Sequence, residues 1–135
     1  MSVVVWVKLL KEFIMNIDNI KKLIKTLEAV EYVEDVRRAE SGFNMLDYTH
    51  DCGTPSCIAG YAAFLSNPND FENSECYNKA VSWLGLDHNG GALRLFCPLT
   101  VTDWDDIKPE HVIKALNIII EENDIPENIW ERVMK

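Results

Sequence analysis

The chain has 135 residues, with 47% apolar and 26% charged side chains, which is ordinary for one globular domain. Its net charge is −9, and the acidity is uneven: residues 1–38 are near neutral, whereas residues 39–135 carry six Lys and Arg against sixteen Asp and Glu. Such a field repels phosphates and anionic lipids, so we expect no direct nucleic-acid binding and no membrane binding. This negative charge is consistent either with binding to a basic protein partner or with a contribution to solubility alone.

The first fourteen residues are apolar but interrupted by Lys8 and Lys11. They lack the basic start and the cleavage site of a signal peptide, and they are too short to span a bilayer. We interpret residues 1–14 as either an appended segment or an extra amphipathic helix. Four cysteines without a secretory signal favour a reducing cytoplasm, in which thiols are unbonded, metal-bound or redox-active.

Helical periodicity dominates the rest of the chain. Residues 17–30 place apolar side chains at three- and four-residue steps after a cap at Asn16 or Asp18, and Tyr32 to Val36 continue this pattern weakly. Ser41-Gly42 interrupts it, and Phe43 to Tyr48 indicate an extended lead-in to the cysteines.

Further helices are predicted between Gly and Pro signals. The expected ranges are 54–65, 74–84 (stopped by Gly85), 92–96 (ended by Pro98), 109–122 (begun by Pro109) and 128–134. Period-two alternation is limited to Val3 to Val7. The sequence therefore predicts an all-α fold, with residues 1–135 forming a single compact domain of five to six helices.

The densest stretch is residues 50–63, HDCGTPSCIAGYAA. Thr54-Pro55 is typical of a helix start, which would place Cys57 at the third helical position. There the helix dipole and unpaired N–H groups would favour a thiolate. Cys52 would lie close by, across the turn at Gly53.

Three chemical interpretations follow. Cys52 and Cys57 could cycle between dithiol and disulfide; Cys57 could be a nucleophile with His50 as its base; or His50, Cys52 and Cys57 could bind zinc. The fourth zinc ligand would then be one of three residues: His88, His111 or Cys76.

We favour a structural interpretation over these three. Cysteine is among the most buried residue types, and the small residues of 59–63 are typical of close helix packing. Gly60 would then contact another helix, which we expect to be the helix of residues 109–122. On this interpretation the sequence assigns no catalytic residue, no metal and no cofactor.

Candidate ligand or partner contacts are the polar residues of this stretch and one tryptophan: His50, Asp51, Cys52, Thr54 and Trp104. Trp104 stands among three aspartates, so it either marks an exposed partner-binding spot or anchors a loop onto the core. The aromatic residues Trp83 and Phe96 are predicted to be core residues.

Several short motifs resemble a family of small uncharacterised proteins encoded by phages and bacteria. They are Phe43-Asn44-Met45, Cys52-Gly53-Thr54-x-x-Cys57-Ile58-Ala59-Gly60, Trp83-Leu84-Gly85-Leu86, Leu95-Phe96-x-Pro98, Trp104 and Pro109-Glu110-His111. The resemblance covers about residues 43–120 and implies a phage or mobile-element setting without naming catalytic residues.

Charge and setting together suggest a small acidic binding protein. It would act as anti-defence proteins do, by sequestering a host protein or a small signalling ligand. We also expect a homodimer, because symmetric dimers are the commonest assembly. The alternative is a cysteine-dependent enzyme or redox protein that acts through Cys57.

Overall fold

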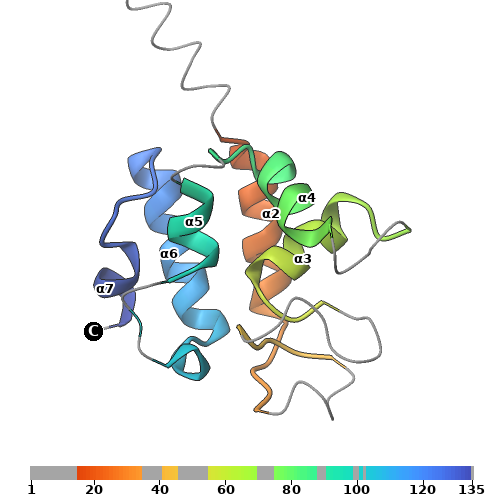
Figure 1. The fold of residues 1–135 in the computed structure, drawn as a ribbon, viewed down its shortest axis with the longest axis horizontal. Coiled ribbons are helices and arrows are strands. Elements are labelled where there is room, and N and C mark those ends of the chain that lie inside the picture. The colour runs from red at the N-terminus through yellow and green to blue at the C-terminus, as the bar shows by residue number, and fades with distance from the viewer. Residues whose placement is uncertain are drawn as a thin grey trace, which may run out of the picture.

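The computed structural model describes residues 15–34, 41–45, 55–69, 75–87, 91–98, 101 and 103–134. The regular elements in these ranges are helices, and extended pairing is limited to isolated bridges such as that between Tyr32 and Phe43 (Figure 1). The helices are α2 (Ile17–Glu28), α3 (Ile58–Ser66), α4 (Cys76–Leu84), α5 (Gly91–Phe96), the 3-10 turn η2 (Trp104–Asp106), α6 (Pro109–Glu122) and α7 (Ile129–Met134). They form a single compact arrangement, so the all-α prediction is confirmed. The single-domain boundary of 1–135 stays a prediction, because residues 1–14 lie outside the described ranges.

Helix α2 forms where the apolar periodicity predicted it. Asn16 is the cap, and its side chain accepts the backbone N–H of Asn19 at 3.0 Å. The apolar stripe of Ile20, Leu23 and Leu27 is buried, and α2 packs mainly against α6. The lysines on the opposite face are exposed to water.

The weak continuation of this helix through Tyr32 was a wrong prediction. The helix ends at Glu28, and the chain turns extended so that Tyr32 bridges Phe43. The Phe43 N–H donates to the Glu31 carbonyl at 2.7 Å, and the Val33 N–H donates to the Phe43 carbonyl at 3.0 Å. Tyr and Val favour this extended backbone over a helix.

Helix α3 is the most deeply buried helix among those described. Every residue from Ile58 to Ala63 is buried, as small-residue helix packing requires. Its main neighbour is α4, with α2 on another side. The expectation that Gly60 packs against the helix of residues 109–122 is therefore corrected: α6 packs on α2 and α7 instead, and α4 covers α3.

The C-terminal helices form the other half of the molecule (Figure 1). Pro109 begins α6, as predicted, and its apolar face is buried. The Trp130 indole N–H donates to the Arg94 carbonyl at 2.8 Å, which joins α7 to α5. The Arg94 guanidinium donates in turn to the Ile125 carbonyl at 2.9 Å.

Two buried polar residues connect the loops to the helices. Asn44 and Ser56 are fully buried, and they exchange hydrogen bonds: the Asn44 N–H donates to the Ser56 carbonyl at 3.1 Å, and the Ser56 hydroxyl donates to the Asn44 carbonyl at 2.9 Å. The Asn44 side-chain amide also donates to the Val33 carbonyl at 2.8 Å and to the Asp105 carboxylate at 3.4 Å. Residues 33 and 105 therefore meet at the Asn44 side chain, and Ser56 bonds to the backbone of the same residue.

Gly42 should not tolerate a side chain. Its φ is +115°, and a Cβ there would lie 2.7 Å from a Val33 methyl and 2.9 Å from the Glu31 carbonyl oxygen. We expect Gly42→Ala to lower the free energy of unfolding by about 1–3 kcal/mol in urea titrations. Gly91→Ala is the matched control, because its Cβ would meet only the end of the Ile125 side chain, at 3.1 Å. Equal unfolding midpoints for the two variants would contradict this account.

Tyr61 should make stability fall at high pH. Burial raises the pKa of Tyr61 to about 12, although a hydrogen bond to the Gly42 backbone opposes the shift. Because tyrosine titrates near 10 in an unfolded chain, the buried hydroxyl stabilises the fold below pH 10, and this contribution is lost between about pH 10 and 12. We expect the free energy of unfolding to fall more steeply over that range in the wild-type protein than in Tyr61→Phe. Parallel slopes would show that Tyr61 titrates normally.

Candidate functional site

The cysteine motif folds differently from its predicted form. Helix α3 begins at Ile58, so Cys57 is the cap and not the third helical residue, and Thr54 is not the cap. Just before the helix, Ser56 is tied to Asn44 by two hydrogen bonds, one from the Asn44 N–H to the Ser56 carbonyl and one from the Ser56 hydroxyl to the Asn44 carbonyl. The backbone of Cys57 remains extended (φ −93°, ψ −179°), and the helix begins only after it.

The Cys57 sulfur is used to cap α3. Sγ accepts the Gly60 N–H at 3.4 Å, and the residue is 7% exposed. The expected proximity of the sulfur to helix N–H groups is thus present, but the thiol is enclosed by the protein. A nucleophile must reach its substrate, and this position offers little access.

Most of the partners proposed for Cys57 fall outside the described residues. His50, Asp51, Cys52 and Thr54 belong to this group, as does His88, so their proximity to Cys57 stays a prediction. Of the two that are described, Cys76 is fully buried at the start of α4. His111 is the other, and its Nδ1 accepts the Lys108 N–H at 2.9 Å at the start of α6. Within the described ranges, no three His, Cys, Asp or Glu side chains gather as metal ligands would.

Trp104 has the geometry of a loop anchor. Its indole N–H donates to the Pro98 carbonyl at 3.1 Å, and its ring packs against the core. The aspartates around it also have structural contacts: Asp103 caps η2, and the Asp105 carboxylate accepts hydrogen bonds from Asn44 and Tyr32. Lys108 is engaged as well, since its Nζ lies 3.2 Å from the Tyr32 ring centroid and donates to the Asp105 carbonyl.

A hollow between two helices offers a more open site. It has a volume of about 570 Å³. The end of α3 forms one wall and the outer face of α4 forms the other. We call this site the α3–α4 hollow; its lining residues are Ser66, Asn67, Glu75, Asn78, Lys79, Ser82 and Trp83.

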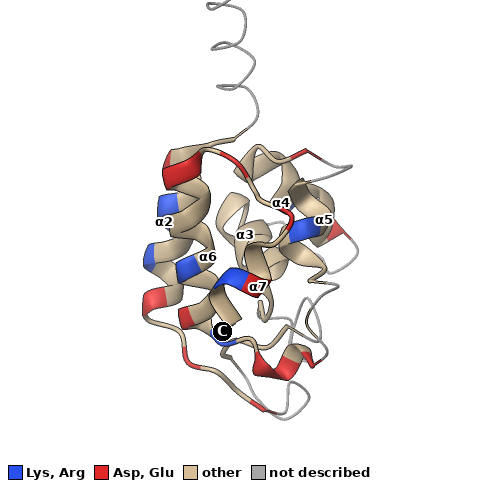
Figure 2. Ribbon diagram, turned by 90° about the vertical axis from the view of Figure 1, so that its left-hand side faces the viewer, with Lys and Arg blue, Asp and Glu red and all other residues tan. Residues whose placement is uncertain are grey.

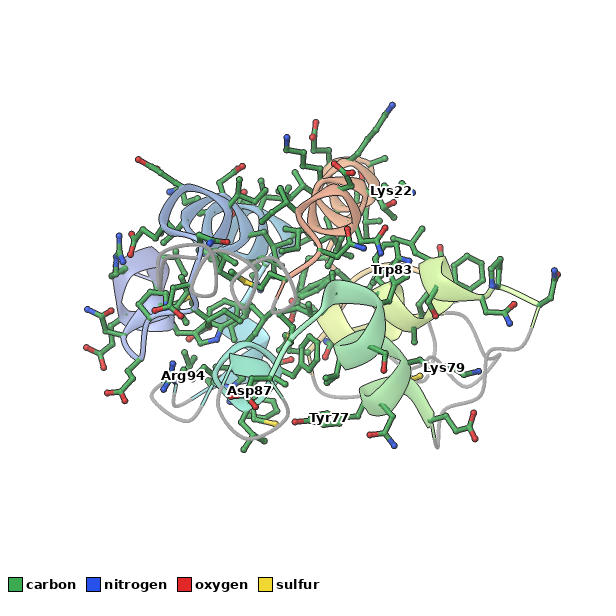
Figure 3. All side chains as sticks on the ribbon, turned by 90° about the horizontal axis from the view of Figure 1, so that it is seen from above. Lys22, Tyr77, Lys79, Trp83, Asp87 and Arg94 are labelled. Carbon is green, nitrogen blue, oxygen red and sulfur yellow. The ribbon has the colours of Figure 1, made fainter. Side chains whose placement is uncertain are left out.

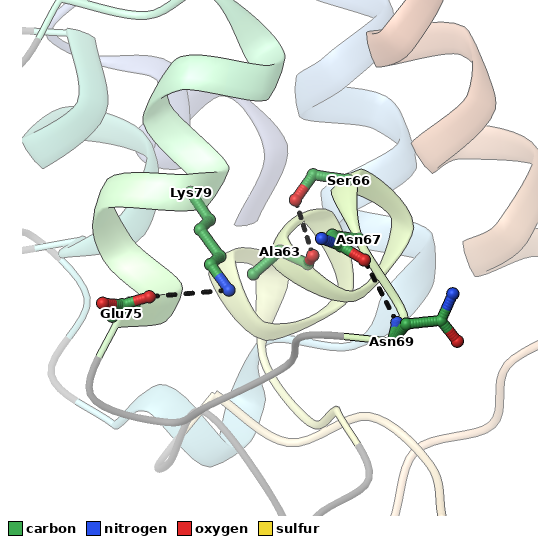
Figure 4. A network of polar contacts seen from close by, with 6 residues as sticks. All are labelled: Ala63, Ser66, Asn67, Asn69, Glu75 and Lys79. Carbon is green, nitrogen blue, oxygen red and sulfur yellow. Dashed lines mark hydrogen bonds and ion pairs between the residues drawn. The ribbon is translucent and has the colours of Figure 1, made fainter.

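The polar groups of the α3–α4 hollow come from a helix end and a helix stripe. Positions 75, 78–79 and 82–83 recur at helical spacing, so they share one face of α4. Lys79 reaches from α4 toward the end of α3, and its ammonium group lies 3.5 Å from the Glu75 carboxylate (Figure 4). Across from it, the Asn67 side-chain oxygen accepts the Asn69 N–H at 3.2 Å.

Trp83 differs from the other described tryptophans. Trp104 and Trp130 both donate their indole N–H to backbone carbonyls. Trp83 donates to no described residue, and its nitrogen is not buried, so this N–H faces the hollow or solvent. Figure 3 shows Trp83 on the side of α4 toward α2, where the Asn19 amide donates to the Trp83 carbonyl at 2.7 Å.

The sequence analysis placed Trp83 in the core and overlooked the α3–α4 hollow. Trp83 is only partly buried and packs against the core from its edge. The missed signal was the polar stripe on α4, in which Asn78 and Ser82 precede Trp83 on the same helical face. Only the tertiary structure shows that the end of α3 lies opposite these α4 residues and that the two together line a hollow.

One ion pair lies at the hollow. Among the described lining residues, Lys79 is the one lysine or arginine, and its ammonium group pairs with the Glu75 carboxylate. Away from the hollow, acidic residues predominate in the chain, while α2 carries a row of lysines (Figure 2). The described lining of the site therefore offers hydrogen-bonding side chains, one ion pair and one tryptophan.

Comparisons with known proteins give no relative. No protein-family model matches the chain, and neither the curated proteins nor the solved structures contain a match. Among the described helices, none is both long enough and apolar enough to cross a bilayer.

The capping role of Cys57 predicts a particular order of stabilities. Cys57→Ala removes the acceptor for the Gly60 N–H and should lower the free energy of unfolding by about 0.5–2 kcal/mol. Cys57→Ser keeps an acceptor, so it should lose less. Urea unfolding of both variants measures the difference. If Ser proved as damaging as Ala, packing of the sulfur would matter and capping would not.

Proposed function

We propose that this protein is a small acidic binding protein that sequesters a small ligand in the α3–α4 hollow. The observation that carries the proposal is the lining of this hollow, where Trp83 lies together with Asn78 and Ser82, whose side chains make no hydrogen bond with described residues. Aromatic and amide groups around a concave site are typical of ligand binding.

The size and chemistry of the hollow support a small ligand over a large one. Ligand pockets commonly measure about 300–1,000 Å³, and this one has about 570 Å³. The side chains of Asn78 and Ser82 make no hydrogen bond with described residues, so they can bond a ligand without breaking existing contacts.

The cysteine-dependent alternative has weaker support. Cys57 is buried, and its sulfur accepts a helix N–H. A reaction there would require both the cap and the surrounding packing to open. We therefore propose a structural role for this thiol.

The biological setting belongs to the same proposal. The resemblance of the Cys-Gly-Thr block to small phage and bacterial proteins suggests an anti-defence protein that withdraws a small signalling ligand from its host. The acidic surface fits a cytoplasmic protein that avoids nucleic acids. The expected homodimer stays a prediction.

Native mass spectrometry tests the proposal directly. The protein is equilibrated with a small-molecule extract of bacterial cells, and we expect one non-covalent adduct per chain. Asn78→Trp should abolish the adduct, because the new side chain would fill the hollow. Asn117→Trp is the matched control, since Asn117 is an exposed helical asparagine on α6 that does not line the hollow. An adduct retained in Asn78→Trp, or no adduct at all, would refute the proposal.

A further inference from the structure

We propose that a second surface of this protein binds an extended peptide in which lysine or arginine alternates with apolar residues. This surface, the α2–α6 hollow, is lined by the end of α2, the extended segment that follows it and the start of α6, and it has a volume of about 380 Å³. It shares no lining residue with the α3–α4 hollow, so the proposal goes beyond the proposed function. Three properties support it: an unpaired backbone edge, a negative charge and apolar side chains.

The extended segment after α2 has one paired edge and one unpaired edge. On the paired edge, the Glu31 carbonyl accepts the Phe43 N–H at 2.7 Å, and the Val33 N–H donates to the Phe43 carbonyl at 3.0 Å. Because successive residues of an extended chain direct their N–H and C=O groups to opposite edges, those of Tyr32 point away from Phe43. Neither backbone group of Tyr32 bonds to a described residue, and Tyr32 lines the hollow. Such an edge is a template for the addition of an extended peptide.

The charge of the hollow selects a basic partner. Glu28, Glu31 and Glu110 line it, and none of these carboxylates pairs with a described lysine or arginine. Lys108 is the one lysine or arginine among the described lining residues, and its ammonium group already donates to the Asp105 carbonyl. Three carboxylates against one engaged ammonium leave the lining negative, and complementary charge favours a basic partner over an acidic one.

Further acidic residues act on the same segment. Burial raises the pKa of Tyr32, and the negative charges of Asp105, Glu34 and Asp103 raise it further, because they disfavour a second anion at the Tyr32 hydroxyl. The same field attracts a lysine or arginine side chain that lies along the segment. The lysines of α2 do not line the hollow.

Apolar side chains provide the remaining contacts. Leu27, Val30 and Ile113 line the hollow; Leu27 is buried, and the other two are partly buried against the core. An extended peptide directs successive side chains to opposite faces. A peptide of alternating basic and apolar residues therefore presents one face to the carboxylates and the other to this apolar surface.

Fluorescence anisotropy with defined peptides tests the proposal. The probe is a fluorescein-labelled hexapeptide of alternating Lys and Val, and the corresponding Glu and Val peptide is the reference. We expect the Lys peptide to bind and the Glu peptide not to bind. Glu28→Lys should weaken binding about tenfold or more, because it reverses a charge at the hollow.

Glu121→Lys is the matched control. Glu28 and Glu121 are both exposed, and both lie in the last turn of their helices, so the two variants have the same net charge and the same effect on a helix dipole. Glu121 does not line the hollow, so its variant should bind the Lys peptide nearly as well as the wild-type protein does.

N-methylated peptides test the backbone edge. Methylation of the three valines removes the N–H groups of one edge of the extended peptide, and methylation of the three lysines removes those of the other edge. We expect one of these peptides to lose about tenfold in affinity and the other to bind like the unmodified peptide, because only one edge can pair with Tyr32.

The contrary outcomes are distinct. If the Lys peptide does not bind, or if Glu28→Lys and Glu121→Lys weaken its binding equally, the hollow is not its site and the proposal fails. Full binding of both methylated peptides would overturn the edge pairing. Spermine carries positive charge without a peptide backbone; if it binds as tightly as the Lys peptide and with the same dependence on Glu28, the hollow recognises charge alone and the proposal fails.

Discussion

One buried residue, Asn44, connects the described extended segments to the helices through its hydrogen bonds. It is fully buried, and its backbone and amide groups bond to the segment after α2, to the start of α3 and to η2. A buried amide that lost these partners would leave several polar groups unsatisfied in the interior. The extended bridge between Tyr32 and Phe43, the positive-φ Gly42 and the aspartates of η2 therefore lie around the same buried residue.

The same hydrogen bonds decide what the cysteine motif becomes. Asn44 holds Ser56 by two hydrogen bonds directly before the extended Cys57, and the first turn of α3 starts after Cys57. The sulfur then accepts a helix N–H in an enclosed position. The spacing of the motif had suggested an activated thiol at Cys57. In the fold, Cys57 is the cap of α3, directly after the Ser56 that bonds to Asn44.

The burial of α3 also determines which of its side chains are available to contact a ligand. From Ile58 to Ala63 the helix is enclosed, so its first polar groups appear at its end, at Ser66 and Asn67. The outer face of α4 lies opposite them, with Trp83 at its edge. The site we propose is therefore built from the side chains that packing leaves uncovered.

Local patterns in the sequence were sufficient to predict the all-α class, a cap at Asn16 or Asp18, the helix stop at Gly85 and the Pro109 start, because each depends on a few neighbouring residues. The structure selects Asn16 as the cap. The ending of α2, the late start of α3 and the pairing of α3 with α4 required the tertiary structure, since long-range hydrogen bonds and buried area override local propensity. The anchoring of Trp104 and the openness of Trp83 were decided in the same way. Both are tryptophans near a helix boundary. The Trp104 indole N–H has the Pro98 carbonyl within hydrogen-bonding distance, whereas the Trp83 indole N–H bonds to no described residue.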